Sequence, residues 1–222
     1  MADLRVLFLE EVASTQDAAI EHDLQIGEAC VSYNQTAGRG RRGKDWKCAG
    51  GVALTVVVEE VQAHLPIALA ATLAAQLNNL IPQKKIGIKW PNDLFVEGKK
   101  IAGILIEHRA NRALVGIGIN VHESPIPTAT CLKECGCETN QSLVTDLAIG
   151  SVVDAMQLDV NKAVSQWRTR DILVGTTQAI RSGDNTVVGL VISIDPCNNL
   201  ILQTSHCILE LPAATSTIIT PC

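Results

Sequence analysis

Aromatic residues and long hydrophobic runs are both scarce in this chain. Aromatic side chains make up 3% of the 222 residues and hydrophobic residues 47%, so the core has to be built from Ala, Val, Ile and Leu. The most apolar stretch, residues 67–80, is interrupted by Thr72 and Gln76. It is also shorter than the roughly 18–20 apolar residues that cross a membrane. The first residues lack the basic and apolar regions of a signal peptide. We therefore expect a soluble, cytoplasmic protein.

Positive charge is scarce as well, apart from one short segment. The net charge is −5 and the pI is about 5.5, which argues against the broad basic surface of a nucleic-acid-binding protein. Residues 35–46 read Gln-Thr-Ala-Gly-Arg-Gly-Arg-Arg-Gly-Lys-Asp-Trp. Cations and glycines are interleaved in this segment: Arg39, Arg41, Arg42 and Lys44 with Gly38, Gly40 and Gly43.

This Gly/Arg loop, residues 38–44, is suited to binding an anion that carries more than one negative group. Glycine lets the backbone approach a ligand closely, and arginine presents planar sets of donors that fit carboxylates and phosphates. Because its like charges repel one another, we expect the loop to become ordered around its anion. Two other interpretations are a solvated charged loop and an Arg-Gly nucleic-acid segment. The acidic pI and a single neighbouring aromatic residue, Trp46, weigh against the second.

Three of the eight cysteines lie close together. Cys131, Cys135 and Cys137 form a C-x3-C-x-C cluster, but no fourth ligand follows at a spacing typical of zinc sites. The sequence therefore predicts reduced, unpaired thiols in a surface loop rather than a metal site. Cys30 and Cys207 lie in strand-like runs, where we expect them to be small core residues.

The hydrophobic patterns divide the chain into two regions near residue 175. Residues 1–172 mix strand and helix signals, which predicts an α+β domain. Strands are expected at residues 4–9, 30–33, 52–58, 86–90, 94–96, 101–107 and 113–121. Helices are expected after Ser14, with Asp17 completing a capping box, from Pro66 to Leu80, and after Asp159. Residues 175–222 hold short strand-like runs at 177–180, 186–194, 200–204 and 208–211, which predict a small β-barrel or sheet.

Four motifs occur in a fixed order along the first region. Ser14-Thr15-Gln16 precedes the Gly/Arg loop, and three segments follow it: Lys89-Trp90-Pro91-Asn92-Asp93-Leu94, Lys100-Ile101-Ala102-Gly103-Ile104-Leu105-Ile106-Glu107 and Gly116-Ile117-Gly118-Ile119-Asn120-Val121. In this order and spacing, residues 10–125 resemble the biotin protein ligase family. Only about 13 residues precede Ser14, so we expect the minimal form, without an N-terminal DNA-binding domain.

The resemblance implies a fold and a reaction. The fold is a mixed or antiparallel sheet flanked by helices, similar to class II synthetases, as a catalytic domain of residues 1–172. An SH3-like β-barrel of residues 175–222 follows it. The reaction joins the biotin carboxylate to the α-phosphate of ATP, giving biotinyl-5′-AMP and pyrophosphate, with Mg²⁺ as cofactor. A lysine of a carrier protein then attacks this anhydride and releases AMP.

The resemblance also implies which residues bind and react. Arg41 and Lys100 are expected at the reacting carboxylate, and Asp93 is expected to orient Lys100, to accept the proton of the attacking lysine or to help hold Mg²⁺. Biotin contacts are expected from Ser14, Thr15, Gln16, Gln35, Gly38, Arg39, Gly40, Arg41, Lys100 and Gly103. Gln16 stands where the family usually has Asn, so its contact with biotin is open.

Nucleotide contacts are implied by the same resemblance. They are expected from Arg42, Lys44, Trp46, Lys89, Asn92, Asp93 and Asn120. Arg42 and Lys44 face either pyrophosphate or solvent, and Asn92-Asp93 is alternatively an Asx turn after Pro91. Trp46 and Trp90 either pack against adenine or are core residues.

The expected partners are biotin, ATP and the carrier domain of a biotin-dependent carboxylase, with neither DNA nor a membrane. The strand at residues 113–121 is a candidate sheet edge for a homodimer. A lipoate or octanoate ligase of the same fold is the main alternative function. It is disfavoured because the loop reads Gly-Arg-Gly-Arg-Arg-Gly instead of the glycine-triplet loop of those proteins.

Overall fold

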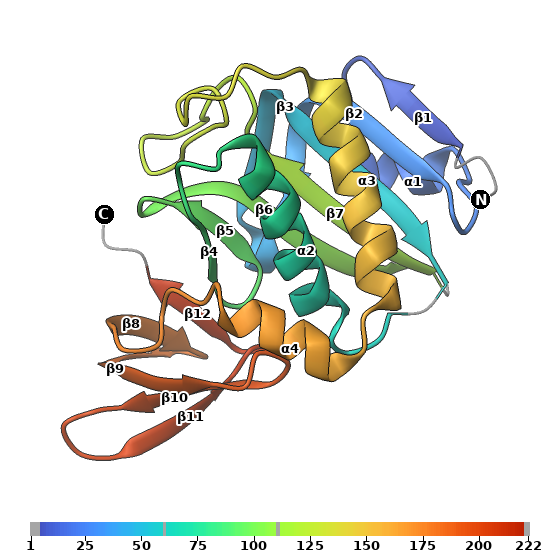
Figure 1. The fold of residues 1–222 in the computed structure, drawn as a ribbon. Helices are drawn as coiled ribbons and strands as arrows, with labels where there is room; N and C mark the ends of the chain where they lie inside the picture. Colours follow the sequence, from blue (N-terminus) through green and yellow to red (C-terminus); the bar gives the residue numbers. More distant parts are fainter. Residues whose placement is uncertain (1–4, 60, 110–111, 220–222) are drawn as a thin grey trace.

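A computed structural model describes residues 5–59, 61–109 and 112–219. They form a seven-stranded sheet with helices on both faces, followed by a five-stranded antiparallel sheet (Figure 1). The first sheet contains β1 (Val6–Leu9), β2 (Ala29–Arg39), β3 (Asp45–Val58), β4 (Ile86–Lys89), β5 (Asp93–Val96), β6 (Lys99–Arg109) and β7 (Arg112–Ile119). The helices are α1 (Thr15–Glu21), α2 (Leu65–Leu80), α3 (Gln141–Gln157), α4 (Val160–Arg168) and a 3-10 helix (Arg41–Gly43). The second sheet contains β8 (Thr177–Ser182), β9 (Asn185–Ile194), β10 (Asn199–Gln203), β11 (Ile208–Pro212) and β12 (Ser216–Ile219).

The first sheet has the order β1-β2-β3-β7-β6-β5-β4, with β1 and β2 parallel and the other pairs antiparallel. Alternate residues of its strands point to opposite faces. Cys30, Val57 and Leu114 pack with α1 on one face. Their neighbours Val31 and Val56 pack with α2 and α3 on the other face (Figure 1). The predicted α+β class with a mixed sheet is therefore confirmed.

Most of the predicted elements of the first region are present. Pro66 lies in the first turn of α2, and the Asp159 side chain caps α4 by accepting a hydrogen bond from the Lys162 N–H. Glu97 and Gly98 have positive φ values of 49° and 81° in the turn between β5 and β6. Helix α3 was not predicted, because residues 141–157 show no clear apolar stripe.

The Gly/Arg loop is shorter than predicted. β2 extends to Arg39 and β3 begins at Asp45, so Gly38 and Arg39 belong to a strand and residues 40–44 form the connecting turn. The predicted capping box at α1 is wrong. Ser14 occupies the N-cap position without a side-chain cap bond, and Asp17 binds Arg39 instead.

The second sheet has the order β11-β10-β9-β8-β12. Four of its strands were predicted, and β12 was missed although Thr217, Ile218 and Ile219 are β-branched. The described residues form a five-stranded antiparallel sheet with β11 and β12 at its ends, so a closed barrel remains a prediction. The Trp90 indole N–H donates to the Pro196 carbonyl at 3.2 Å, and residues of both sheets share one hydrophobic cluster.

Two predictions for the cysteines are wrong. Cys131 and Cys135 are buried rather than in a surface loop, and Cys207 is exposed rather than in the core. Cys30 is buried, as predicted. All seven described cysteines are free, and the part of the chain that the structure describes contains no group of three or more potential metal-ligating His, Cys, Asp or Glu residues.

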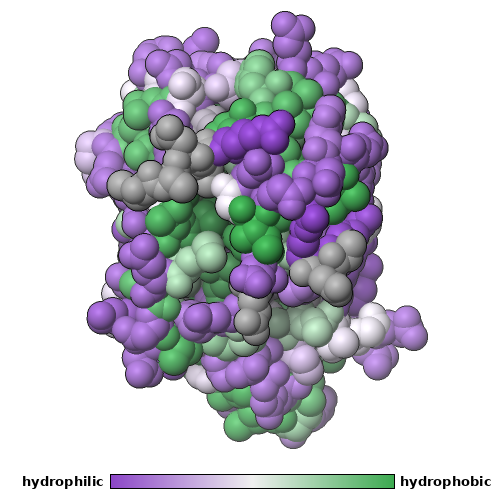
Figure 2. All heavy atoms as spheres, turned by 90° about the vertical axis from the view of Figure 1, so that its right-hand side faces the viewer, coloured by the Kyte–Doolittle hydropathy of each residue, from purple (hydrophilic) through white to green (hydrophobic). Residues whose placement is uncertain are grey.

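The proposed dimer edge is also corrected. β7 lies between β3 and β6 inside the sheet, so the strand predicted at residues 113–121 offers no free edge. Among residues 5–59, 61–109 and 112–219, no helix has the length and hydrophobicity to cross a membrane. On the face turned by 90° from the ribbon view, hydrophobic residues form several separate areas among hydrophilic ones (Figure 2).

Candidate active site

A cavity of about 660 Å³ lies on the α1 face of the first sheet. All the predicted site residues line it except Gly38 and Arg42. The cavity exists because this face of the central strands carries small residues. Ala53 pairs with Gly118, and Gly118 also pairs with Gly103, so three neighbouring strands present almost no side chain at one point.

Two glycines of β7 let larger side chains lie flat against the sheet. A Cβ atom at Gly118 would be 2.2 Å from Cε2 of Trp46. A Cβ atom at Gly116 would be 2.7 Å from the Gln16 amide nitrogen. The glycines of the Gly116-Ile117-Gly118 motif therefore make room for Trp46 and Gln16, which form part of the cavity wall.

One end of the cavity presents the neutral polar side chains of Thr15 and Gln35. The Thr55 hydroxyl donates to Thr15 Oγ1 at 2.8 Å, and the Thr15 backbone N–H donates to Gln35 Oε1 at 2.8 Å. The Gln35 amide nitrogen lies against Gly38, where a Cβ atom would be 1.9 Å away. Gly38 thus supports the site by leaving space for Gln35 rather than by lining the cavity.

Gln16 binds the sheet backbone. Its amide nitrogen donates to the carbonyls of Leu105, at 3.0 Å, and Leu114, at 3.3 Å. The side chain is 5% exposed. Gln has one methylene more than Asn, and this extra length lets the Gln16 amide reach the backbone carbonyls of β6 and β7.

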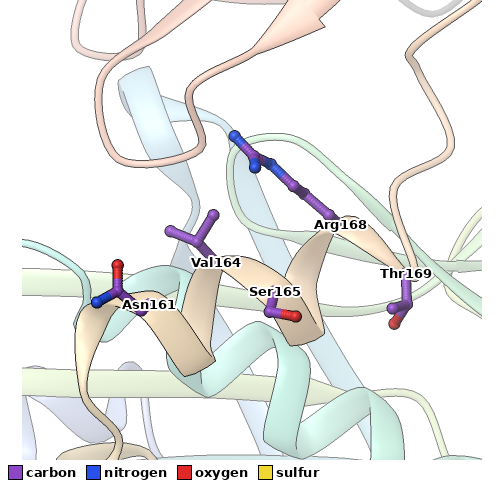
Figure 3. A pocket seen from close by; sticks show the side chains of 5 residues that line it. All are labelled: Asn161, Val164, Ser165, Arg168 and Thr169. Carbon is purple, nitrogen blue, oxygen red and sulfur yellow. The ribbon is translucent and has the colours of Figure 1, made fainter.

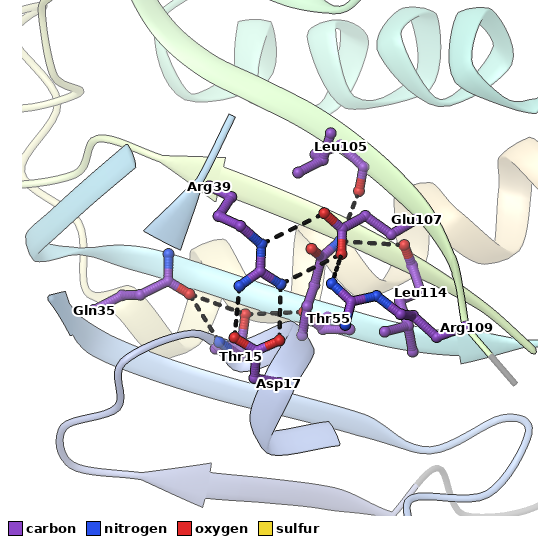
Figure 4. Close-up of polar contacts among 10 residues, drawn as sticks. Thr15, Asp17, Gln35, Arg39, Thr55, Leu105, Glu107, Arg109 and Leu114 are labelled. Atoms are coloured by element: carbon purple, nitrogen blue, oxygen red, sulfur yellow. Dashed lines mark hydrogen bonds and ion pairs between the residues drawn. The ribbon is translucent and has the colours of Figure 1, made fainter. Parts of the chain in front are cut away.

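Arg39 is held by two carboxylates (Figure 4). It donates to both oxygens of Asp17, at 2.5 and 2.8 Å, and to Glu107 at 3.3 Å. The hydrogen bond from Arg39 lowers the pKa of Asp17 below its ordinary value. Glu107 also accepts from Arg109 at 3.0 Å. Arg39 lines the cavity, but its charge is already neutralised within this network.

The opposite end of the cavity is cationic. Lys100 Nζ lies 2.6 Å from Asp93 Oδ1 and 5.0 Å from the centre of the Trp46 ring. Lys89 Nζ lies 5.1 Å from the centre of the Phe95 ring. Burial lowers the pKa of Lys89, and the charge of Asp93 opposes this effect. Two lysines and a carboxylate thus share a partly desolvated wall, where charge acts over short distances.

Two asparagines and a tryptophan have structural partners. The Asn92 amide donates to the Ile104 carbonyl at 2.5 Å, which differs from the local Asx turn considered as an alternative. The Asn120 amide donates to the Thr130 carbonyl at 2.9 Å. Trp90 is 2% exposed and belongs to the main core cluster, so it is a core residue at the cavity edge, unlike Trp46.

Arg41 and Arg42 reach the second sheet. Arg41 Nη2 donates to the Ala213 carbonyl at 2.5 Å. Arg42 donates to Thr217 Oγ1 at 2.6 Å and to the Ala214 carbonyl at 3.2 Å. Burial, followed by the charge of Arg42, lowers the pKa of Arg41. Arg41 lines the cavity and Arg42 does not, so the two adjacent arginines lie in different environments.

This arrangement agrees with comparisons to known proteins. The model of the Biotin/lipoate A/B protein ligase family matches residues 10–124. The chain belongs to this family. The Biotin--[acetyl-CoA-carboxylase] ligase of Paracoccus denitrificans is 30% identical over 209 residues, which cover 83% of this chain and 87% of that protein. The ligase of the same description from Mycobacterium tuberculosis is 29% identical over 203 residues, covering 80% of this chain and 73% of that protein.

A solved structure supports the same fold for both sheets of this protein. The biotin protein ligase from Aquifex aeolicus in complex with biotin and ATP superposes with a TM-score of 0.86 at 24% identity. The superposition covers 98% of this chain and 99% of the Aquifex chain. The second sheet therefore belongs to the shared architecture and is not an unrelated appendage.

The sequence did not reveal two walls of the cavity. One wall consists of Pro125, Ile126, Thr128 and Ala129, and the other of Thr217 and Ile218 from β12. The first wall is tied to Lys100, whose N–H donates to the Thr128 carbonyl at 3.3 Å. β12 lies far along the chain from the motifs, so no local pattern linked it to the cavity.

A second cavity of about 640 Å³ is lined only by residues of α4 and the turn after it (Figure 3). These residues are Asn161, Val164, Ser165, Arg168 and Thr169. None of the predicted site residues lies there, and the lining combines no nucleophile with a base. The cavity on the α1 face is the candidate active site.

Proposed function

We propose that this protein is a biotin protein ligase that forms biotinyl-5′-AMP from biotin and ATP and transfers biotin to a lysine of a carrier domain. The observation that carries the proposal is the distribution of neutral and charged groups along the cavity of about 660 Å³. One end offers neutral hydrogen-bonding groups of Thr15 and Gln35, which fit a ureido ring. The other end offers Arg41, Lys89 and Lys100, which fit a carboxylate and phosphates.

The first step joins two anions, so the cations have to offset their repulsion. A biotin carboxylate oxygen attacks the α-phosphorus of ATP, and the bond to pyrophosphate breaks. Lys100 is positioned by Asp93, and its ammonium group attracts both the attacking carboxylate and the phosphate oxygens. Arg41 lines the same cavity. Fixed charges of this kind stabilise the transition state because they need no reorganisation as charge moves.

Asp93 is the one carboxylate of the catalytic set, and it fits a Mg²⁺ that accompanies ATP. Such ions take one or two protein carboxylates and complete their coordination with phosphate oxygens and water. Asp93 is 28% exposed on its side chain and lines the cavity. When bound, Mg²⁺ would neutralise part of the phosphate charge. Asp93 would hold the ion and continue to orient Lys100.

In the second step the carrier lysine attacks the activated carbonyl of biotin. The new C–N bond forms, the bond to the phosphate oxygen breaks, AMP leaves and the amine loses a proton. Asp93 is the residue we propose to receive that proton, since it lies beside the reacting centre. The acceptor is the biotin carrier domain of a carboxylase, a proposal supported by the names of the relatives. The cytoplasmic location stays a prediction.

Transfer of labelled biotin tests the proposal. The purified protein is incubated with ATP, Mg²⁺ and a biotin carrier domain, and labelled lipoate replaces biotin in a parallel reaction. We expect ATP-dependent incorporation of biotin and none of lipoate. A carrier domain with its acceptor lysine changed to arginine serves as the control. Incorporation of lipoate in preference to biotin would contradict the proposal.

A further inference from the structure

Arg42 was expected either to contact pyrophosphate or to be solvated, and the structure shows an exposed side chain that also binds a distant part of the chain. Its guanidinium group reaches from the Gly/Arg loop to β12, 175 residues away in sequence. Three hydrogen bonds connect the loop to residues 213–217. They run from Arg41 to the Ala213 carbonyl, and from Arg42 to the Ala214 carbonyl and to Thr217 Oγ1.

The backbone at Arg42 indicates that these contacts hold the turn. Arg42 has φ 58° and ψ 39°, in the left-handed region, and Gly43 follows with φ 70°. A residue with a side chain avoids this conformation unless its surroundings fix it. Backbone hydrogen bonds close the turn, from the Gly40 N–H to the Lys44 carbonyl at 2.6 Å and from the Lys44 N–H to the Arg41 carbonyl at 3.4 Å. The bonds of Arg42 to Ala214 and Thr217 anchor this turn to the second sheet.

The position of the turn decides where Arg41 lies. Arg41 is adjacent to Arg42 and lines the cavity, as do Thr217 and Ile218 of β12. One side of Thr217 therefore faces the cavity while its hydroxyl binds Arg42. A change at Thr217 would alter the turn and, through it, the charge that Arg41 presents to a ligand.

We propose that Arg42 and Thr217 form a clasp that positions the Gly/Arg loop over the cavity, so that Arg42 is a positioning residue and not a phosphate ligand. The clasp fixes Arg41 at the reacting end and keeps the loop closed over the bound acyl-adenylate. The second sheet thereby acts on the reaction through β12. The inference rests on the proposed function for its consequences in catalysis, but the clasp itself is a property of the free protein.

Limited trypsin cleavage tests the clasp without any ligand. Thr217→Val removes the hydroxyl at nearly the same volume, and Thr217→Ser retains it. We expect cleavage after Arg41, Arg42 and Lys44 to be about threefold to tenfold faster in Thr217→Val than in wild type, the range of a hydrogen bond from a partly exposed charged group. Thr217→Ser should behave as wild type. Thr177→Val, an exposed strand position of the same sheet, is the matched control.

A double-mutant cycle tests the role in the reaction. Arg42→Ala, Thr217→Val and the double variant are compared for release of biotinyl-5′-AMP, read as biotin attached to a bystander protein. Kinetic constants for ATP are measured in parallel, with Arg168→Ala as an exposed-arginine control. Each single change should raise adenylate escape by about threefold to tenfold, and the double variant should not exceed the larger single effect.

The outcomes separate the two proposals. If Arg42→Ala raises KM for ATP while Thr217→Val has no effect, Arg42 is a phosphate ligand and the clasp is wrong. The clasp would also be wrong if the fold-increases in adenylate escape of the two single variants multiplied in the double variant. Equal rates of cleavage for Thr217→Val and wild type would contradict it as well. Faster cleavage of Thr217→Val in a protein without biotin-dependent pyrophosphate release would retain the clasp and reject the ligase function.

Discussion

The expected role of Lys100 in the reaction follows from where its ammonium group lies. A lysine beside a strand turn is usually a surface residue, whereas here its ammonium group is held 2.6 Å from Asp93 on the cavity wall. The pair is about one third exposed, with side-chain exposures of 29% and 28%, so it contributes little to folding stability. Its contribution to a reaction between two anions is expected to be much larger, because the charge is fixed close to the reacting atoms.

We therefore expect Lys100→Ala to reduce biotin-dependent pyrophosphate release by about two to three orders of magnitude, the range of a lost electrostatic contact in an active site. The free energy of unfolding should change by less than about 1 kcal/mol. The neighbouring Lys99→Ala is the matched control, because Lys99 is exposed outside the cavity. Near-normal activity of Lys100→Ala would remove this residue from the mechanism.

Asp17 gives a pH dependence with a defined sign. Its pKa is lowered from the ordinary value of 3.8, chiefly by the hydrogen bond from Arg39. A lowered pKa in the folded state stabilises the protein above the unfolded value, and this stability is lost as the pH falls through the lowered pKa. Because the side chains are 33% and 38% exposed, the contribution is at most about 1 kcal/mol.

Unfolding of wild type and Asp17→Asn should be compared from pH 7 to pH 3. We expect wild type to be the more stable protein near neutrality and the difference to shrink below about pH 4. A difference that grows as the pH falls would contradict the assigned sign.

Helix α3, which the sequence analysis did not predict, offers a test of helix stability. It contains Gly150, where a Cβ atom would meet no atom within 4 Å. Glycine inside a helix is less stable than alanine by roughly 0.5–1 kcal/mol. Gly150→Ala is therefore expected to raise the free energy of unfolding by that amount, as measured in urea.

Gly175→Ala is the matched control for this prediction. Gly175 also has nothing within 4 Å of a built Cβ atom, but its φ is +85°. Alanine is strained in that conformation, so we expect this change to destabilise the protein. If both variants change the free energy of unfolding in the same direction, the positive φ of Gly175 does not account for the effect of alanine, and the prediction is wrong.

At the scale of the elements, the sequence was most accurate where patterns are local. Pro66 marks the first turn of α2, and Asp159 caps α4. It was less accurate at the start of the Gly/Arg loop, because strand pairing extended β2 to Arg39, into a segment whose glycines and charges indicated a loop. Pairing between distant residues overrides local propensity in this case.

For the whole molecule, the two sheets are expected to unfold together. The Trp90 indole N–H binds the Pro196 carbonyl across them, and Trp90 is 2% exposed. Trp90→Phe leaves that buried carbonyl unpaired, which costs about 1–3 kcal/mol. We expect a lower urea midpoint with an unchanged m value, as for a single cooperative unit.

Trp167→Phe is the control. Trp167 is 1% exposed in the same cluster, and its indole nitrogen has no hydrogen-bond partner among residues 5–59, 61–109 and 112–219. The two variants lose similar volume, so Trp90→Phe should be the less stable by the value of one hydrogen bond. A two-step unfolding curve for Trp90→Phe would show that the sheets are independent.

The sequence by itself determined the family, the order of the motifs, the α+β class and most of the residues around the cavity. Motifs such as Lys100-Ile101-Ala102-Gly103 can be recognised from the sequence because their residues are adjacent in the chain. The tertiary structure alone decided what those residues touch. It assigned Arg39 to Asp17 and Glu107, buried Cys131, enclosed β7 within the sheet and brought Thr217 to Arg42. These contacts join residues far apart in the chain, and local patterns carry no information about such distances.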